Sequence, residues 1–478
     1  MISGAREAFS LSFNPFKLIT QEDYQRIHDA SLQILRETGV VFHSQEALEI
    51  FKKHGARVNG EIVYLDAPMI EHALESCPEK FVWQARNPDH SVTVGEGILI
   101  QPNVGPVYIE DLDRGRRLAT LKDYANIMKL CQASDVIDLN GSIPVDPSDV
   151  EADKKYFYIM YEMLKNTDKP IIGACVSRPE AKKMLEMAEL ALGQEGFLEQ
   201  NPCVGVLVNS LSPLAYAPET LETIIEYSRK KQIILLAPCI MAGVSGPISL
   251  LGTAVLQNVE LLAGITLTQL VNPGTPVVYA TASTVGYMKT ASYAAGSPEA
   301  MLINTPNIQM GLDFYHLPTR TMCGINHAKV LDCQAGYETM MSLMMGLMSG
   351  AHIFVQCLGV LDAIMTTSYE KIIIDEELIR RVKRIRQGVD TSDKALAVDV
   401  IQEVGYNGTY LTHESTFESF RNIWLPTVSN WESYQDWRAE GGEDVTVRAH
   451  RRYKEILAKA PESLLDPEVE KALRRYLV

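Results

Sequence analysis

The sequence lacks the short signatures that mark the common nucleotide-binding and acyl-transfer enzymes. It contains no GxGxxG after a predicted strand, no P-loop and no GxSxG nucleophile elbow. Each of these motifs builds a turn that presents backbone N–H groups or a nucleophile, so nucleotide and acyl-enzyme mechanisms have no support here. Basic charge is also in deficit, because the formal net charge is −16 at pH 7. Phosphate recognition needs a basic face, and we therefore expect no nucleic-acid partner.

The cysteine pattern and the absence of targeting signals indicate the cellular compartment of the protein. The eight cysteines are scattered and most lie in apolar runs, which predicts buried free thiols in a reducing compartment. The first residues, MISGAREAFS, lack a basic region followed by an apolar core, so we expect no signal peptide. We also expect no apolar run of membrane-spanning length and no membrane partner. These features predict a cytoplasmic protein.

What the sequence does contain is a repeat of strand and helix patterns. Seven short, β-rich apolar runs begin near residues 138, 171, 203, 233, 276, 316 and 352, at intervals of about 30 to 43 residues. That length suits a strand, a helix and two loops, so the pattern predicts parallel strands alternating with helices. Closure into a barrel needs an eighth strand. The candidates are ILIQP near Ile98 and TYLTH near Thr409, and we favour the second.

We therefore predict an α/β fold, a (β/α)₈ TIM-type barrel with N-terminal and C-terminal helical elaborations. Residues 1–135 are expected to form a helical and short-strand elaboration packed on the barrel, 136–415 the barrel, and 416–478 a C-terminal helical extension. The first helix is expected to follow Thr20, which with Asp23 resembles a capping box.

Polar side chains stand at or just after the predicted strand ends. In a barrel these ends converge on one mouth, so residues distant in sequence meet there. The set consists of Asn209, Ser210, Thr281, Ser283, Gln356, His413 and Glu414. Ordinary loop polarity explains any one of them, whereas the set as a whole favours a functional mouth.

Aromatic residues and possible metal ligands lie near the same loops. The aromatic set is Tyr108, Tyr279, Tyr287, Tyr293, Phe314, Tyr315, Tyr337, Tyr410 and Trp424. Such rings hold a quaternary ammonium by cation–π attraction within about 6 Å, although most of these are expected to be core. A zinc site from His316, Cys323, His327 and Cys333 is the alternative. Their spacing matches no structural zinc motif, so we expect no metal bound by this chain.

The longest distinctive segments are LAPCIMAGVSGPISLLGTAVLQNVELLAGITLTQLVNPGTPVVY, GSPEAMLINTPNIQMGLDFYHLPTR, DCQAGYETMMSLMMGLMSGAHIF and THESTFESFRNIWLPTVSNWESYQDW. Together with the N-terminal IHDASLQILRETGV, they resemble the trimethylamine methyltransferase family over nearly the whole chain. The resemblance implies a (β/α)₈ barrel that moves a methyl group from a methylated amine to the Co(I) of a separate corrinoid protein.

The resemblance is to the branch of that family without pyrrolysine. The founding members carry pyrrolysine in the barrel, whereas this chain has only the twenty standard residues, with Gln334 our assignment for the replaced position. The branch includes enzymes for glycine betaine, carnitine and proline betaine, and we expect glycine betaine as substrate and dimethylglycine as product. The sequence has no DxHxxG cobalamin-binding signature, so the cobalamin must arrive on a partner protein.

The implied reaction needs positioning more than acid–base chemistry, because a quaternary ammonium already carries a neutral leaving group. We expect Tyr279 and Tyr337, with the Glu414 carboxylate, to hold the cation. We expect the other members of the site to bind the substrate carboxylate or shape the pocket, and they are Asn209, His327, Gln356 and His413. No catalytic residue is assigned, and a homo-oligomer is expected.

Two alternatives to this function stay open. One is a zinc-dependent corrinoid methyltransferase that acts on a thiol or an alcohol. The other is a non-catalytic betaine-binding protein. The substrate also stays open between glycine betaine and another quaternary amine such as carnitine or proline betaine.

Overall fold

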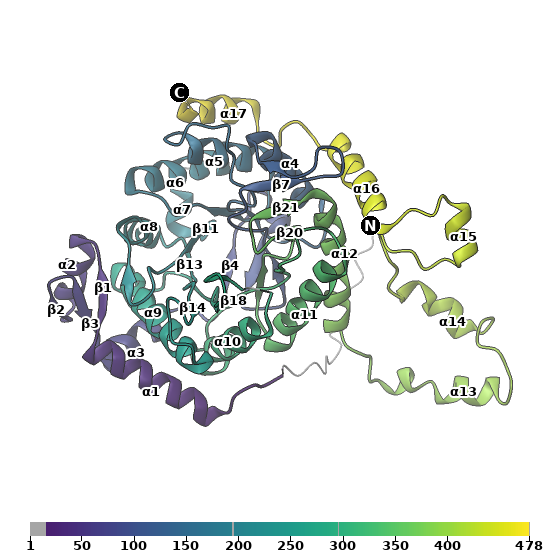
Figure 1. The fold of residues 1–478 in the computed structure, drawn as a ribbon, viewed down its shortest axis with the longest axis horizontal. Helices are drawn as coiled ribbons and strands as arrows, with labels where there is room; N and C mark the ends of the chain where they lie inside the picture. The colour runs from purple at the N-terminus through teal and green to yellow at the C-terminus, as the bar shows by residue number, and fades with distance from the viewer. Residues whose placement is uncertain (1–15, 194–195, 295, 478) are drawn as a thin grey trace.

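The computed structural model describes residues 16–193, 196–294 and 296–477. Its main sheet has eight parallel strands in the order β6-β19-β18-β15-β13-β11-β10-β9. These are β6 (Leu99–Ile100), β9 (Asn140–Gly141), β10 (Ile171–Gly173), β11 (Val204–Val208), β13 (Ile233–Leu236), β15 (Val277–Ala280), β18 (Thr319–Met322) and β19 (Ile353–Val355). The backbone N–H of Leu139 donates to the carbonyl of Ile100 at 3.0 Å, so the two edge strands meet. The predicted TIM-type barrel is confirmed (Figure 1).

The eighth strand is β6, so our preference for the segment near Thr409 was wrong. A strand of a parallel barrel is buried on both faces, which requires a continuous apolar run such as the ILI of ILIQP. Residues 409–413 instead lie on an exposed arm, where the Leu411 side chain is 83% exposed. The predicted division of the chain at residues 135 and 415 stays a prediction, with one barrel strand inside its first part.

One long helix follows each strand and covers the barrel from outside (Figure 1). In chain order these are α4 (Leu121–Ala133), α5 (Lys155–Asn166), α6 (Arg178–Leu192), α8 (Pro218–Arg229), α9 (Leu250–Val271), α10 (Pro298–Gln309), α11 (Cys333–Ser349) and α12 (Tyr369–Arg386). Contrary to expectation, α9 is long and apolar enough to cross a membrane. It packs against α1, α3, α8 and α10, and 78% of its most apolar window is buried, so the barrel core accounts for its composition.

Side chains fill the lumen in layers. The lower layer holds Leu99, Leu139, Ile172, Leu235, Val278 and Ile353, and a hairpin of β4 (Phe81–Trp83) and β5 (Val92–Val94) packs against it. The Trp83 indole N–H donates to the carbonyl of Cys203 at 3.0 Å. A Cβ atom at Gly205 would lie 2.3 Å from the Trp83 ring, so this strand needs glycine where the ring seats. The layer above it carries smaller side chains, among them Ala237 and Ala280.

The N-terminal part packs beside α9 and contains three helices and a small sheet (Figure 1). It comprises α1 (Gln21–Glu37), α2 (Gln45–Lys53), α3 (Ala67–Ser76), β1 (Val40–Phe42), β2 (Arg57–Asn59) and β3 (Ile62–Tyr64), and β1 pairs with β12 (Ala215–Tyr216). The capping box of Thr20 and Asp23 is confirmed. The helix α3 begins after the N-cap residue Asp66 and has Pro68 in its first turn, two residues that are favoured at the start of a helix.

An arm of residues 389–443 extends away from the barrel before the chain returns (Figure 1). It carries α13 (Val398–Val404), α14 (Glu414–Ser419) and α15 (Tyr434–Ala439), and is followed by α16 (Val445–Lys459) and α17 (Pro467–Leu473). The helix α16 packs against α12 and α4, so the chain after the arm covers the barrel again.

Candidate functional site

The loops that follow the barrel strands form two small sheets at the carboxyl ends of those strands. One consists of β14 (Met241–Ala242), β16 (Thr284–Tyr287) and β17 (Ser292–Tyr293). The other consists of β20 (Val360–Leu361), β21 (Thr366–Ser368), β7 (Tyr108–Glu110) and β8 (Arg117–Leu118). We call the region that these sheets frame the mouth. It is the end of a barrel at which binding sites form.

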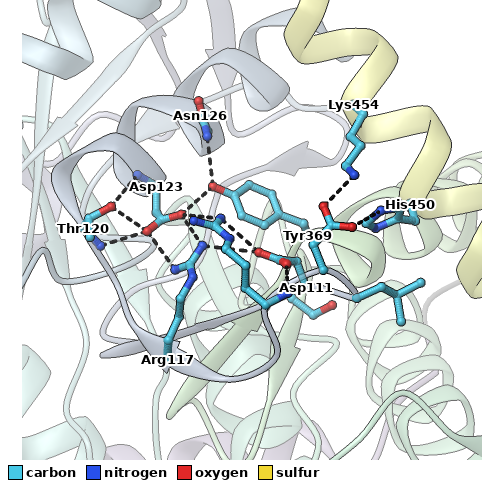
Figure 2. A network of polar contacts seen from close by, with 12 residues as sticks. Asp111, Arg117, Thr120, Asp123, Asn126, Tyr369, His450 and Lys454 are labelled. Atoms are coloured by element: carbon cyan, nitrogen blue, oxygen red, sulfur yellow. Dashed lines mark hydrogen bonds and ion pairs between the residues drawn. The ribbon is translucent and has the colours of Figure 1, made fainter.

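A buried ionic network anchors the second of these sheets (Figure 2). Asp123 of α4 accepts hydrogen bonds from Arg117 at 2.8 and 2.9 Å and from the Tyr369 hydroxyl at 3.0 Å. Burial alone would raise the pKa of Asp123, but the bonds from Arg117 and Thr120 outweigh it and lower that pKa. The network therefore joins the edge of the mouth to α4 and α12 in a fixed arrangement.

Two polar side chains that sequence reasoning did not select face each other inside the lumen. Arg320 of β18 is 2% exposed, and its Nε–H donates to Oε1 of the fully buried Gln101 at 2.8 Å. Arg320 lies beside Ala280 in the strand register, on the inward face. Burial lowers the pKa of Arg320 to about 9, so the guanidinium is cationic at neutral pH. The sequence feature that could have identified Arg320 is a charged residue in the middle of a predicted barrel strand.

Asn209 and Gln356 stand at the ends of their strands, as predicted, and bind neighbouring backbone. The Asn209 side-chain amide donates to the carbonyl of Ala237, at the end of the next strand. The Gln356 amide donates to the carbonyl of Val104 at 2.8 Å and accepts from its N–H at 3.3 Å. Gln356 has a φ of +64°, in the left-handed region, and holds the loop that follows Gln101. Both side chains therefore bind backbone groups at the carboxyl end of the barrel.

His327 lies in the loop after β18 and has both ring nitrogens engaged. Its Nδ1 accepts from the N–H of Gly296 at 3.3 Å, which assigns the ring hydrogen to Nε2, 3.0 Å from the carbonyl of Tyr293. Its backbone N–H donates to Glu338 at 2.6 Å, and Glu338 also accepts from Gln334 at 2.9 Å. The structure therefore brings His327 and Gln334 together at the mouth, where they support the loop bearing Tyr293.

The two tyrosines that we expected to hold the cation are not brought together. Alternation along β15 turns Val278 and Ala280 inward, so Tyr279 points outward into the helix layer. Its hydroxyl donates to Oδ1 of Asn258 at 2.8 Å. Tyr337 lies on the outer helix α11 and is 61% exposed. The two rings therefore do not face one common site.

His413 and Glu414 lie at the start of α14 on the arm, because the predicted strand before them does not exist. The His413 Nδ1 atom accepts from the N–H of Ser415 at 3.2 Å, as an N-cap does. Glu414 is exposed. The structure does not bring either residue to the mouth.

One aromatic ring does reach the inner cluster of the mouth. Tyr293 of β17 packs against Ala282, Met322 and Ile325, and its hydroxyl donates to the carbonyl of Ala282. This ring was among the aromatic candidates but was not selected from them.

The possible zinc ligands are spread out. His316 and Cys333 are exposed, whereas Cys323 is fully buried against α11. Within residues 16–193, 196–294 and 296–477, no three His, Cys, Asp or Glu side chains gather as a metal-binding group.

An apolar rim lies along one side of the mouth, on the loops after four consecutive strands. Its exposed side chains are Leu211, Val244, Ile248, Tyr287, Met288 and Val330. A Cβ atom at Gly243 would lie 2.8 Å from Ile248 and 3.1 Å from Met288, so part of the rim is contiguous. Apolar side chains exposed together at one end of a barrel fit a surface that another protein covers.

Comparison with known proteins matches the full length of the chain. The sequence profile of the family described as trimethylamine methyltransferase (MTTB) matches residues 5–478. A glycine betaine methyltransferase from Desulfitobacterium hafniense (strain Y51) is 36% identical over 97% of this chain and 96% of that protein. A proline betaine:corrinoid methyltransferase from Eubacterium limosum is 32% identical over 95% of this chain and 98% of that protein. The solved structure of the Methanosarcina barkeri monomethylamine methyltransferase (MtmB) has the same fold, with a TM-score of 0.55 and 12% identity over 93% of this chain and 89% of that one.

Proposed function

The chain belongs to the trimethylamine methyltransferase family, and we propose that it moves a methyl group from glycine betaine to the Co(I) of a separate corrinoid protein. The observation that carries the proposal is full-length similarity to two betaine methyltransferases, with identities of 36% and 32%. Carnitine and proline betaine are the alternative substrates within the same reaction. We place the reaction in the cytoplasm.

In this reaction the N–CH₃ bond breaks and its electron pair stays on nitrogen, so the leaving group is the neutral tertiary amine of dimethylglycine, which keeps its carboxylate. The electron pair for the new bond to the methyl carbon would come from the reduced corrinoid of a bound carrier protein. No proton is needed to expel the amine, so this chain's residues have to orient the substrate and exclude water. Asn209, His327 and Gln356 do so by holding the strand ends and loops of the mouth.

The apolar rim is evidence that a large partner protein binds at the mouth. The methyl group must pass directly between two proteins, so the carrier has to cover the opening through which the substrate nitrogen faces out. The rim residues Val244, Ile248 and Met288 are exposed on that side of the barrel. A chain that used only small soluble acceptors would have no need of exposed apolar side chains there.

Methyl transfer is tested by incubating the purified chain with Co(I)-cobalamin and one amine at a time. Loss of the Co(I) absorbance is expected with glycine betaine, with dimethylglycine as the product, and not with trimethylamine. Carnitine and proline betaine serve as the matched quaternary amines. Binding of a betaine without any loss of Co(I) absorbance, by metal-free and zinc-loaded protein alike, would favour the betaine-binding alternative.

We also propose that the chain is a homo-oligomer and that the arm contributes to its interface. The arm's exposed apolar side chains are Val389, Leu396, Val398, Ile401, Tyr406, Tyr410, Leu411, Phe417, Phe420, Ile423, Leu425, Trp431 and Tyr434. So many exposed apolar side chains on one segment are unusual for a monomer.

Light scattering after size-exclusion chromatography is expected to give a mass that is a multiple of 53.2 kDa. Leu411→Lys combined with Phe417→Lys is expected to shift the mass toward one chain. Gln402→Lys combined with Ser419→Lys, at two exposed positions of the same arm, is the charge-matched control and should leave the mass unchanged. A wild-type mass of one chain would contradict the proposal.

A further inference from the structure

The lumen holds a cluster of hydrogen-bond donors with no acceptor to meet them. Arg320 uses only its Nε–H, on Oε1 of Gln101, and its two terminal nitrogens donate to none of the described residues. Because Oε1 faces the guanidinium, the Gln101 amide nitrogen faces elsewhere, and it is buried without a partner in the described part of the chain. Buried donors are nearly always satisfied, so this exception calls for an acceptor from outside the chain.

Lys371, a cation of the described residues that is as deeply buried as Arg320, shows one way in which the chain satisfies such a group for structure alone. Lys371 lies 2.7 Å from both oxygens of Asp375 and 3.0 Å from the Thr339 hydroxyl. Arg320 has no carboxylate partner among the residues described. A guanidinium left without a counter-ion in a buried site is costly to folding, and it is retained where a ligand supplies the missing charge.

The surroundings limit the size and polarity of that ligand. Ala280 lies beside Arg320 in the strand register and Ala237 belongs to the same inner cluster, so small side chains line this level of the lumen. Above them, toward the mouth, lie Met322, Tyr293 and Val355. A ligand that accepts hydrogen bonds from Arg320 and Gln101 therefore has a small anionic group at one end. The rest of the ligand contacts the apolar side chains of Met322, Tyr293 and Val355.

We propose that Arg320 and Gln101 bind the carboxylate of the substrate at the inner end of the site, so that its methylated nitrogen points out toward the mouth. This inference rests on the proposed function and adds to it the orientation of the bound substrate. The carboxylate accepts from the terminal nitrogens of Arg320 and from the amide of Gln101, which completes the donor set. An amine without a carboxylate loses these bonds, so the pair selects amino-acid betaines over trimethylamine and over choline.

Binding, measured by calorimetry without any corrinoid, tests the assignment. The ligands are glycine betaine, choline, and 3,3-dimethylbutyrate, which keeps the carboxylate but replaces the ammonium nitrogen with carbon. Arg320→Met is expected to weaken glycine betaine and 3,3-dimethylbutyrate at least tenfold and to leave the weak binding of choline unchanged. Gln101→Leu is expected to weaken the same two ligands by a smaller factor. The control is Arg86→Met, which removes a half-buried arginine that donates to the carbonyl of Thr167; this variant should bind like wild type.

The outcomes separate this inference from the proposed function. Equal affinity of wild type and Arg320→Met for both carboxylates would overturn the inference and leave methyl transfer standing. Arg320-dependent binding of 3,3-dimethylbutyrate by a protein that does not demethylate glycine betaine would support the carboxylate site and overturn the proposed substrate. Failure of every carboxylate to bind the wild-type protein would overturn the inference. If Arg320→Met does not fold, Arg320→Lys and Gln101→Leu give the same comparison.

Discussion

Replacing Lys371 with methionine is expected to lower the free energy of unfolding by about 3 to 5 kcal/mol. The Lys371 ammonium and the Asp375 carboxylate are one helical turn apart on α12, 2.7 Å from each other, with side-chain exposures of 2% and 1%. Removing the lysine leaves a buried carboxylate whose remaining described partner is the N–H of Gly359, at 2.7 Å. An uncompensated buried charge is among the largest effects a single substitution produces.

The double variant Lys371→Met with Asp375→Asn is the matched control for this loss. Asparagine keeps an acceptor for the N–H of Gly359 but carries no charge, so most of the lost stability is expected to return. Urea unfolding at pH 7, followed by the fluorescence of the four tryptophans, measures both variants. A single variant as stable as the double would show that the Asp375 charge is not what the lysine compensates.

The Lys371–Asp375 pair also supports the mouth. The Thr339 hydroxyl, which accepts from Lys371, donates to the carbonyl of Gly324 at 3.1 Å. Asp375 holds the N–H of Gly359 in the loop after β19. These two loops follow β18, which carries Arg320, and β19, after which Gln356 is the first residue. Loosening the pair is therefore expected to weaken glycine betaine binding as well as stability.

The repeat of strands and helices was predictable because parallel barrel strands are buried on both faces and leave continuous apolar runs. Seven of the eight strands lie where those runs begin. The eighth was misplaced because β6 is only two residues long and is separated from the regular repeat by Gly- and Pro-rich turns. A run that short gives a weak periodic signal, and only closure of the sheet onto Leu139 identifies it.

The site was less predictable than the fold, for a different physical reason. Whether a strand residue faces the lumen depends on the phase of the strand, and a shift of one residue exchanges the two faces. That phase placed Tyr279 outside and Arg320 inside. Residues at strand ends, such as Asn209 and Gln356, were easier to locate because a loop at the mouth needs polar side chains whatever the phase. The family resemblance gave the reaction class but not the orientation of the substrate.

Replacing Glu377 with glutamine is expected to destabilise the end of the arm by about 2 kcal/mol at pH 7 and by a clearly smaller amount at pH 3. Glu377 of α12 accepts from the N–H groups of Thr427, Val428 and Ser429 at 2.7, 2.6 and 3.0 Å. Arg381 donates to its other oxygen at 2.9 Å. The carboxylate therefore fixes the point at which the arm returns to the barrel.

The sign of the pH dependence follows from the pKa of Glu377. Burial alone would raise that pKa, but the donors of Ser429, Val428 and Arg381 outweigh it and lower the pKa to about 2 from an ordinary 4.5. A depressed pKa gives stability that is fully present above pH 4.5 and is lost as the pH falls through 4.5 toward 2. Urea unfolding of wild type and Glu377→Gln at pH 7, 5 and 3 should show the two curves converging as the pH falls. The exposed Glu418→Gln is the control expected to match wild type throughout, and a Glu377→Gln difference that is constant with pH would mean that the carboxylate charge does not hold the arm.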